Sequence, residues 1–422
     1  LSLMFLMLMI WSFYKSRKNK KWLILAAMMA GLSFLTYHSE RVITPLILFC
    51  FLIRDRKNIF DKKNIKILII SGLAGLVLIL PTLKLMATPG FLSRLNSLSI
   101  LSRQPWGFDE NLGGWKNIIF NNQIILKLRE FGSLYIAYFS PRYLFGLGDP
   151  IPRNSYPDLA PFWFWQLPFL IVGWFWLFKK TDKKEAELKF LIILMMIVSP
   201  IPAALTKDPF SAIRALPLAW PLLMLVARGI EECWKYFGNM VRIILIFLVV
   251  WSGGKMYLSI FKFNDYFRGY AWEEGIEEMV DKIKEEKLPI VVDNTRGEIY
   301  CQILFFTQAD PKKYQTENFE VSQENYYTDM KRNGVKQIGQ ISVRPIVWEK
   351  DAYREQILVG DALSINEEQI NEHCLTLLFE VKDRKGRIIF RGLKTHPEDK
   401  LKFEIGDKVD GKLIKKCLIT KP

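Results

Sequence analysis

The chain has 422 residues, of which 50% are hydrophobic and 14% aromatic, and this composition excludes a disordered, collagen-like or disulfide-stapled protein. Its net charge of +15 lies entirely in residues 1–261, which hold 31 basic and 14 acidic residues, whereas residues 262–422 hold 27 and 29. Because this excess lies among apolar segments rather than on a soluble face, we expect a membrane protein followed by a soluble domain, and no nucleic-acid partner.

Eight apolar segments predict a polytopic α-helical membrane domain of about eight spans in residues 1–261. The longer runs are too apolar for ordinary core helices: Trp22–Tyr37, Ile67–Leu83, Leu159–Phe178 and Phe190–Thr206. Four shorter runs can also span if flanking side chains snorkel or the bilayer thins locally: Leu1–Tyr14, Val42–Ile53, Ala215–Ala227 and Ile243–Gly254.

The distribution of basic residues predicts the orientation of these spans. Three short loops, Lys15–Lys21, Arg54–Lys66 and Lys179–Lys189, hold 16 Lys and Arg in 31 residues, whereas Ala87–Ala160 holds 7 in 74. The positive-inside rule then places the short loops in the cytoplasm and the long loop outside. With eight spans, residues 262–422 also lie outside, so we expect a multi-pass plasma-membrane protein of the cell envelope with an extracytoplasmic C-terminal domain.

The chain begins at Leu1 inside an apolar run, without the basic n-region or small-residue cleavage site of a signal peptide. We therefore expect a fragment whose further spans lie upstream. Of the five cysteines, Cys50 and Cys233 lie in or beside spans, and the other three have wide, unmatched spacings that allow one pair without assigning it. The chain has three histidines and no His/Cys cluster, which argues against a zinc site.

Two turns at the predicted outer face carry polar side chains: Tyr37-His38-Ser39-Glu40-Arg41, and Lys207–Pro217 with Arg214. Polar groups are costly at membrane depth unless they line a cavity. Arg41 and Arg214 can converge on one site, and the arginine fork suits a phosphate or diphosphate. The alternatives are an interfacial turn with a Glu40–Arg41 pair, and arginines that serve only as snorkelling anchors.

The long loop 87–160 is too long for a simple connector. Its segment Trp115–Leu126 predicts an amphipathic helix in the membrane interface. The loop ends in the Pro-rich segment Gly148–Pro157, which contains Arg153. The aromatic run Trp163–Trp176 that follows is typical of an interfacial belt.

Residues 262–422 predict a small α+β soluble domain. Helices are expected at Trp272–Lys287 and Glu298–Thr307, and a buried strand at Leu288–Val292. Further strands are expected at Val335–Trp348, Leu375–Val381, Arg387–Gly392 and Leu401–Ile405, with a hairpin turn at Lys385-Gly386. The domain has no phosphate-loop or Ser/His/Asp pattern, which favours an accessory or structural role.

Three segments in order resemble the GT-C glycosyltransferases of bacteria, relatives of the dolichyl-phosphate-mannose protein mannosyltransferases and of the aminoarabinose lipid A transferase. They are Gly31–Arg41, then Gly148–Asn154 leading to Gln166–Leu170, and Pro200–Thr206 followed by Ser211–Ala215. The resemblance extends over about residues 1–310 and departs at Asn154 and Ser211, where the family often has His.

The resemblance implies transfer of a hexose or pentose from a polyprenyl-phosphate donor to a protein, lipid or glycan acceptor at the outer leaflet. The residues expected to bind the donor phosphate or substrate are Tyr37, Glu40, Arg41, Arg153 and Arg214. The family's catalytic aspartate lies in its first outer loop, which we expect upstream of Leu1, so the enzyme is expected to be incomplete in this chain. None of the outer-face acids is assigned as the base: Asp109, Glu110, Asp149, Asp158 and Asp208.

No cofactor is predicted, although related enzymes differ in metal dependence and a divalent metal stays open. Membrane lipids and an unknown acceptor are the other expected partners. Two alternatives remain. A transporter or flippase would be favoured by internal-repeat symmetry or buried proton-relay residues, and the sequence shows neither. A non-catalytic membrane anchor for the C-terminal domain would be favoured by an upstream segment with no acid in its outer loop.

Overall fold

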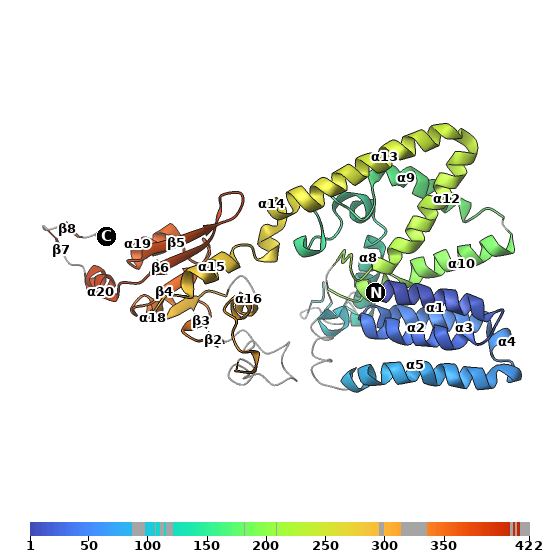
Figure 1. Cartoon of the computed structure of the whole chain (residues 1–422), viewed down its shortest axis with the longest axis horizontal. Helices are drawn as coiled ribbons and strands as arrows, with labels where there is room; N and C mark the ends of the chain where they lie inside the picture. Colours follow the sequence, from blue (N-terminus) through green and yellow to red (C-terminus); the bar gives the residue numbers. More distant parts are fainter. Residues whose placement is uncertain are drawn as a thin grey trace. The chain divides into compact units, whose positions relative to one another are not determined.

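The computed structural model describes residues 1–86, 98–105, 107–109, 114, 121–180, 182–207, 209–294, 299–313, 336–405, 408–409 and 412–413. The chain divides into two compact units, Leu1–Phe261 (unit 1) and Lys262–Pro422 (unit 2). Their elements are labelled in Figure 1.

Unit 1 is helical, and helices cover half or more of each predicted apolar segment. These helices are α1 (Ser2–Ser16), α2 (Trp22–Thr36), α3 (Glu40–Arg54), α5 (Ile65–Met86), α9 (Leu167–Trp176), α10 (Lys183–Val198) with α11 (Ile201–Ala204), α12 (Ala219–Phe237) and α13 (Asn239–Tyr257). Three helical stretches are long and apolar enough to cross a membrane: Lys62–Lys84, Lys183–Ala204 and Asn239–Trp272. These stretches identify a membrane protein, whereas the count of eight spans stays a prediction.

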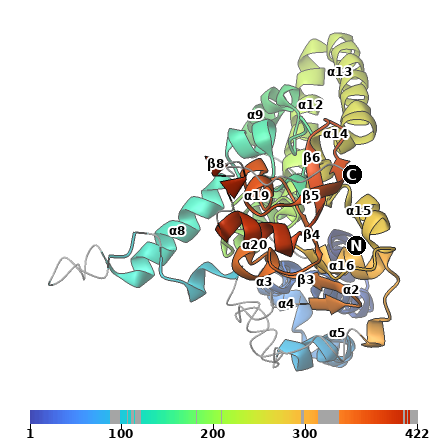
Figure 2. The same ribbon diagram turned by 90° about the vertical axis from the view of Figure 1, so that its left-hand side faces the viewer.

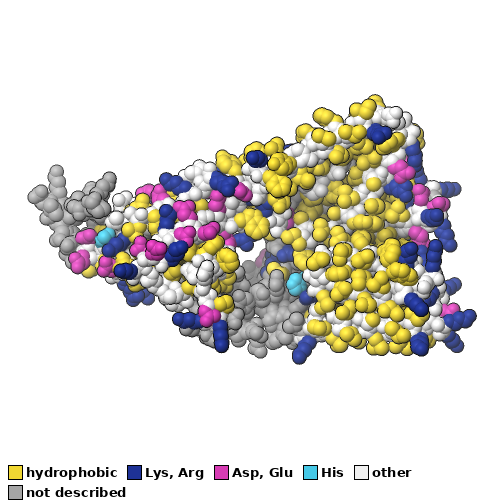
Figure 3. Space-filling model, in the orientation of Figure 1, with side chains coloured by type: hydrophobic (Ala, Val, Ile, Leu, Met, Phe, Trp, Pro, Cys, Tyr) yellow, Lys and Arg dark blue, Asp and Glu magenta, His cyan; other side chains and the backbone are white. Residues whose placement is uncertain are grey.

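The sides of these helices present a broad hydrophobic surface. Figure 3 shows hydrophobic side chains over the helices of unit 1, with charged side chains gathered along one end. Only 17% of the apolar stretch of α5 and 11% of that of α13 is buried inside the protein. A soluble protein rarely exposes so much apolar surface, so these faces fit contact with lipid.

Ion pairs tie the helix ends together at the charged end of unit 1. The Arg17 guanidinium, just after α1, lies 2.9 Å from Asp55 at the end of α3 and 3.1 Å from Glu187 on α10. Arg54 lies 2.7 Å from the same Glu187. The basic loops predicted to be cytoplasmic therefore share one face of the unit.

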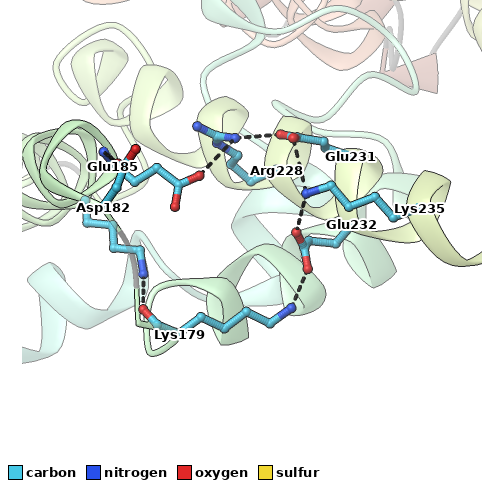
Figure 4. Close-up of polar contacts among 8 residues, drawn as sticks. Lys179, Asp182, Glu185, Arg228, Glu231, Glu232 and Lys235 are labelled. Atoms are coloured by element: carbon cyan, nitrogen blue, oxygen red, sulfur yellow. Dashed lines mark hydrogen bonds and ion pairs between the residues drawn. The ribbon is translucent and has the colours of Figure 1, made fainter.

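A second ionic network joins α10 and the loop before it to α12, as Figure 4 shows. Glu232 on α12 pairs with Lys179 and, at 2.9 Å, with Lys235. Arg228 lies 2.6 Å from Glu231 and 3.8 Å from Glu185 on α10. Exposed pairs of this kind contribute little singly.

Helix α9 packs directly against α12 through two glycines. A Cβ atom at Gly173 would overlap the carbonyl oxygen of Leu225, and one at Gly229 would overlap the carbonyl oxygen of Phe169. The backbones therefore approach more closely than any side chain allows, as small residues permit in membrane helix pairs. This crossing closes a buried cluster that also contains residues of η3 (the π-helix Arg142–Leu147) and α10.

Helix α8 (Gln123–Ala137) lies to one side of the other helices of unit 1, as Figure 2 shows. Its N-cap is Asn122, whose side chain accepts hydrogen bonds from the backbone of Ile124 and Ile125. Several of its apolar side chains are exposed, among them Ile124 and Leu128. The first half of the predicted interfacial helix Trp115–Leu126 lies outside the described residues, and its last four residues begin α8.

Unit 2 contains a six-stranded mixed sheet in the order β2-β3-β1-β4-β6-β5. The strands are β1 (Ile290–Val292), β2 (Lys336–Ile338), β3 (Ile341–Val343), β4 (Ile357–Gly360), β5 (Thr376–Lys382) and β6 (Ile388–Lys394). Strand β1 runs parallel to both β3 and β4, and the other pairings are antiparallel. A further two-stranded pair joins β7 (Lys408–Val409) to β8 (Lys412–Leu413).

Helices cover both faces of the six-stranded sheet. Residues of α15 (Ile276–Ile283) and α16 (Ile299–Phe306) pack against Ile290 and Val292 of β1. The alternate residue Val291 faces a separate cluster with Trp348 of α18 (Trp348–Asp351) and Ile370 of α19 (Glu367–Glu372). The alternation follows from the two-residue period of a strand.

Two features of unit 2 differ from the sequence-based expectation. The parallel pairing of β1 with β3 and β4 at the centre of the sheet was not predicted, and neither was strand β4 itself. Leu401–Ile405 was predicted as a strand, which is wrong, because these residues end helix α20 (Pro397–Ile405). This helix opens with Pro397, Glu398 and Asp399, and proline and acidic residues in the first turn favour a helix start.

A buried ion pair fixes the connection between β3 and β4. Arg344 donates to both carboxylate oxygens of Asp351, at 2.7 and 2.6 Å, and Asp351 is 1% exposed. Burial raises the pKa of the Asp351 carboxyl, but hydrogen bonds from Arg344, the Val347 backbone and Gln356 outweigh it and hold the pKa below its usual range. The pair therefore stabilises unit 2 above the unfolded-state pKa of Asp351, and this contribution is lost as the pH falls through the folded-state value.

We expect Arg344→Ala to destabilise unit 2 by about 2 kcal/mol at neutral pH, because it leaves a buried carboxylate without its cation. The loss should shrink as the pH falls through the lowered folded-state pKa of Asp351, because below that value the carboxyl is protonated in both proteins. Urea-dependent proteolysis of the full chain across a pH series measures both effects. Arg387→Ala, which removes the pair that Asp383 makes with an arginine whose side chain is 60% exposed, is the matched control, and an equal loss in both variants would contradict the prediction.

Candidate functional site

The segment after η3 folds back on unit 1 around the carboxylate of Asp149, which is 4% exposed. Its Oδ1 accepts a hydrogen bond from the backbone of Ile151 at 2.9 Å, closing an Asx turn. Its Oδ2 accepts from the Asn154 side chain at 3.2 Å and from the Ala212 backbone at 2.9 Å. Asp149 thus joins the 148–157 segment to the segment that precedes α12.

Asp149 brings together the segments that carry two predicted site residues. Arg153 lies in η4 (Pro152–Asn154) and is exposed. Arg214 lies two residues after Ala212, and its Nη1 donates to Thr206 Oγ1 at 2.8 Å. Thr206 also pairs with Ser99 in an isolated antiparallel bridge. Residues from three places in the chain therefore fix the position of Arg214.

A cavity of about 420 Å³ lies beside this junction. Asp149, Asn154 and Tyr156 give it polar groups, whereas most of its wall is apolar. The apolar wall comes from η3, the 159–162 segment, the start of α12 and the end of unit 1, and it includes Leu144, Phe162, Leu222, Met256 and Ile260. An apolar pocket with a few polar groups is typical of a binding site for an amphipathic ligand.

Tyrosines buried next to the cavity act as structural groups. Tyr138 is fully buried, and its hydroxyl accepts a hydrogen bond from the Ser211 backbone at 3.0 Å. Burial raises the pKa of the Tyr143 phenol, and neighbouring Tyr138 and Asp149 raise it further. Tyr143 therefore stays neutral at physiological pH and is excluded as a general base.

The remaining predicted site residues lie at the turn between α2 and α3. Tyr37 is the C-cap of α2 and is half-buried, as is Arg41 in the first turn of α3. Glu40 is 1% exposed, and its Oε2 accepts a hydrogen bond from Thr44 at 3.2 Å, while the Thr44 hydroxyl also lies 3.1 Å from the Ser33 hydroxyl on α2. Glu40 precedes the apolar run Val42–Ile53, and burial raises the pKa of its carboxyl.

Helix α3 packs against α10 and α11, and α11 leads directly to Thr206. The α2–α3 turn is thus connected through α11 to the segment that holds Arg214. Convergence of Arg41 and Arg214 on one ligand stays a prediction.

The other acids of the long loop occupy different surroundings. Asp158 is exposed and lies 3.4 Å from Lys255 on α13. Asp109 is exposed, and its backbone pairs with the Asn121 side chain. Glu110 and Asp208 lie outside the described residues. Within the described part of the chain, three or more His, Cys, Asp or Glu side chains nowhere gather in a group that could hold a metal ion.

The sequence analysis named Asp149 among the outer-face acids, but it did not predict that its carboxylate joins the 148–157 segment to the segment before α12. The Asp-Pro-Ile order after Gly148 is an Asx-turn signal that could have revealed the first of its contacts. The contact with Ala212 joins positions far apart in the chain, and no local pattern indicates it.

Unit 1 is therefore a helical membrane domain with an apolar cavity whose polar groups adjoin arginine-bearing segments. The family model described as dolichyl-phosphate-mannose-protein mannosyltransferase matches residues 1–84, which span helices α1 to α3 and most of α5. This match confirms the resemblance to the GT-C superfamily and indicates a membrane glycosyltransferase of that type. Comparisons with curated proteins and with solved structures gave no match.

Proposed function

We propose that this protein transfers a sugar from a polyprenyl-phosphate donor to a protein, lipid or glycan acceptor at the outer face of the plasma membrane. The cavity beside Asp149 carries this proposal. Its apolar wall suits an isoprenoid tail, and the segments joined at its polar groups bear Arg153 and Arg214. A donor anchored by its tail has its phosphate at headgroup depth, where arginines can bind it.

The chemistry assigns distinct roles to these groups. An acceptor hydroxyl attacks the anomeric carbon of the sugar, the bond from that carbon to the phosphate oxygen breaks, and polyprenyl phosphate leaves with the bonding electrons. Arg214, with Arg41 and Arg153, stabilises the negative charge that develops on the phosphate. A carboxylate within hydrogen-bond reach takes the hydroxyl proton, and none of the described acids is assigned that role.

The orientation of unit 2 is part of the proposal. Cys374 is disulfide-bonded, whereas Cys50 and Cys233 are free thiols. Disulfides form and persist in oxidising compartments and are rare in the cytosol. An extracytoplasmic unit 2 therefore agrees with this disulfide. It also agrees with the even number of predicted spans, and the domain would then lie on the same side of the membrane as the proposed acceptor.

Filling the cavity tests the donor site without requiring the sugar to be known. Ala219 lines the cavity at the start of α12, and Ala219→Phe would occupy the space assigned to the isoprenoid tail. We expect the Kd of the purified protein for polyprenyl phosphate to rise about tenfold, a loss near 1.4 kcal/mol. Leu223→Phe, at an exposed position of the same helix, is the matched control and should bind as the wild type does.

An unchanged Kd in Ala219→Phe, in protein that elutes as the wild type does on size exclusion, would contradict the proposed cavity. Equal weakening by both variants would also contradict it, because the effect would then not come from the cavity.

A further inference from the structure

Unit 2 begins with a cluster of exposed aromatic side chains. Helix α14 (Asn264–Arg268), the end of the π-helix η7 before it (Leu258–Phe263) and η8 (Gly269–Trp272) carry five aromatic residues that are 46% to 62% exposed: Phe263, Tyr266, Phe267, Tyr270 and Trp272. Figure 3 shows hydrophobic side chains over α14. Single exposed apolar residues are common, but five within ten residues form a patch of the kind that marks an interaction site.

Basic side chains from the β5–β6 turn join this patch. The Lys385 ammonium lies 4.6 Å from the ring centroids of both Tyr266 and Phe267, a cation–π arrangement. Arg384 lies 3.0 Å from Asp265 on α14. The side chains of Lys382, Arg384 and Arg387 are more than half exposed. The five aromatic residues and the turn Lys382–Arg387 together form what we call the aromatic–basic surface.

The aromatic part of this surface follows a membrane-crossing helix. Helix α13 has 19 residues and is about 28 Å long at 1.5 Å per residue, and separate π, α and 3-10 turns follow it in the chain. The hydrocarbon core of a bilayer is about 30 Å thick, so α13 alone is nearly long enough to cross it, and the aromatic residues that follow come close to the headgroup region. Tyrosine and tryptophan prefer this headgroup region, where an apolar ring and a polar group are both accommodated.

We propose that the aromatic–basic surface docks unit 2 on the membrane that α13 enters and binds anionic phospholipid headgroups there. The aromatic rings enter the interface, and Lys382, Arg384, Lys385 and Arg387 face the negative surface. Lys382, Arg384 and Arg387 pair with Glu380, Asp265 and Asp383, whereas the Lys385 ammonium lies over the Tyr266 and Phe267 rings, and this ammonium is the group that selects an anionic partner. This role is independent of the proposed sugar transfer, and it places the β5–β6 turn, more than 100 residues beyond α14, at headgroup depth.

A nitroxide label on the turn tests the proposal in the full chain reconstituted into vesicles. Cys50, Cys233 and Cys301 are replaced by alanine, and the label is attached through Arg387→Cys. A label through Glu355→Cys is the matched control, because the Glu355 side chain is about as exposed as that of Arg387. Glu355 also lies far from the β5–β6 turn: it precedes β4, and the first residue of β4 pairs with Lys394, at the end of β6 opposite the turn. Collision with oxygen reports lipid contact, and collision with a water-soluble nickel chelate reports exposure to water.

In vesicles containing anionic phospholipid, we expect position 387 to be accessible to oxygen and shielded from nickel, and position 355 to be accessible to nickel. Lys385→Gln should lower the ratio of docked to undocked label about fivefold, the effect of one basic residue near an anionic surface. Raising the salt concentration should lower the same ratio. Lys350→Gln, an exposed lysine on α18, is the control and should leave it unchanged.

Three results would overturn the proposal. Equal access of nickel to positions 387 and 355 would show that the turn stays in water. Shielding of position 387 from both oxygen and nickel would indicate a protein partner instead of lipid. Equal docking in purely zwitterionic vesicles would exclude recognition of anionic headgroups.

Discussion

Gly173→Ala and Gly229→Ala are each expected to destabilise unit 1 by about 3 kcal/mol, which lowers the thermal midpoint by roughly 10 °C. The Cβ added at Gly173 would overlap the carbonyl oxygen of Leu225, and the one added at Gly229 would overlap that of Phe169. A backbone carbonyl cannot rotate away as a side chain can. The two helices must therefore separate, and the buried cluster between α9, α10 and α12 loses contacts.

Thermal unfolding of the detergent-solubilised protein, followed by size exclusion of the heated samples, measures this effect. Gly253→Ala is the matched control, because Gly253 also lies inside a helix but an added Cβ would meet nothing within 4 Å. We expect the control to stay within about 1 kcal/mol of the wild type, since alanine is the better helix former. Midpoints that match the control in both test variants would show that α9 and α12 do not cross as described.

Arg214→Ala is expected to lower sugar transfer by about 100-fold or more in the full-length protein while leaving insertion and expression intact. One preorganised donor to a developing negative charge is commonly worth this much. Arg41→Ala is expected to have a similar effect if both arginines bind the donor phosphate. Arg214→Lys should restore only part of the rate, because lysine keeps the charge but not the fork.

The measurement is transfer of labelled sugar from a panel of polyprenyl-phosphate hexoses and pentoses in isolated membranes. Arg242→Ala, at an exposed position of α13, controls for the loss of an arginine elsewhere. Thr206→Val tests the position of Arg214 without removing its charge, because it removes the hydroxyl that accepts the hydrogen bond from Arg214. We expect the rate of sugar transfer in this variant to fall about tenfold. Rates close to wild type in both Arg41→Ala and Arg214→Ala would refute the phosphate site.

The helices of unit 1 could be predicted because hydropathy is a local signal. A run such as Ile67–Leu83 is apolar on every face, and this pattern requires a helix in lipid whatever surrounds it. The predicted ends of the helices were less accurate where local turns, and not hydropathy, determine where a helix begins. Helix α9 begins at Leu167, although the apolar run begins at Leu159, because Phe162 donates its backbone N–H to Leu144 and the next residues form a separate 3-10 turn, η5 (Phe164–Gln166).

The cavity and its polar groups could not be predicted because their contacts join distant segments. Arg153 and Arg214 were identified from residue type and predicted membrane face. Their connection through Asp149 depends on the hydrogen bond to the Ala212 backbone, and a backbone donor leaves no trace in the sequence. Glu40 was predicted as a site residue, and the structure buries its carboxyl against Thr44.

In unit 2, alternation predicted β5 and β6 with their turn, because an antiparallel hairpin is a local structure. The parallel pairing of β1 with β3 and β4 was missed, since it depends on which distant strands fit the same core. Leu401–Ile405 alternates apolar and charged residues as a strand does, but the start signals at Pro397–Asp399 determine a helix.

Photo-cross-linking tests the central claim, that the cavity beside Asp149 holds a polyprenyl-phosphate donor, most directly. A polyprenyl phosphate with a diazirine in its isoprenoid tail is added to the full-length protein in membranes, and the labelled peptides are identified by mass spectrometry. We predict labelling of residues 143–162 and 212–222, reduced by Ala219→Phe and by excess unlabelled polyprenyl phosphate. Labelling confined to the lipid-facing sides of α5 and α13, unaffected by competitor, would contradict the account.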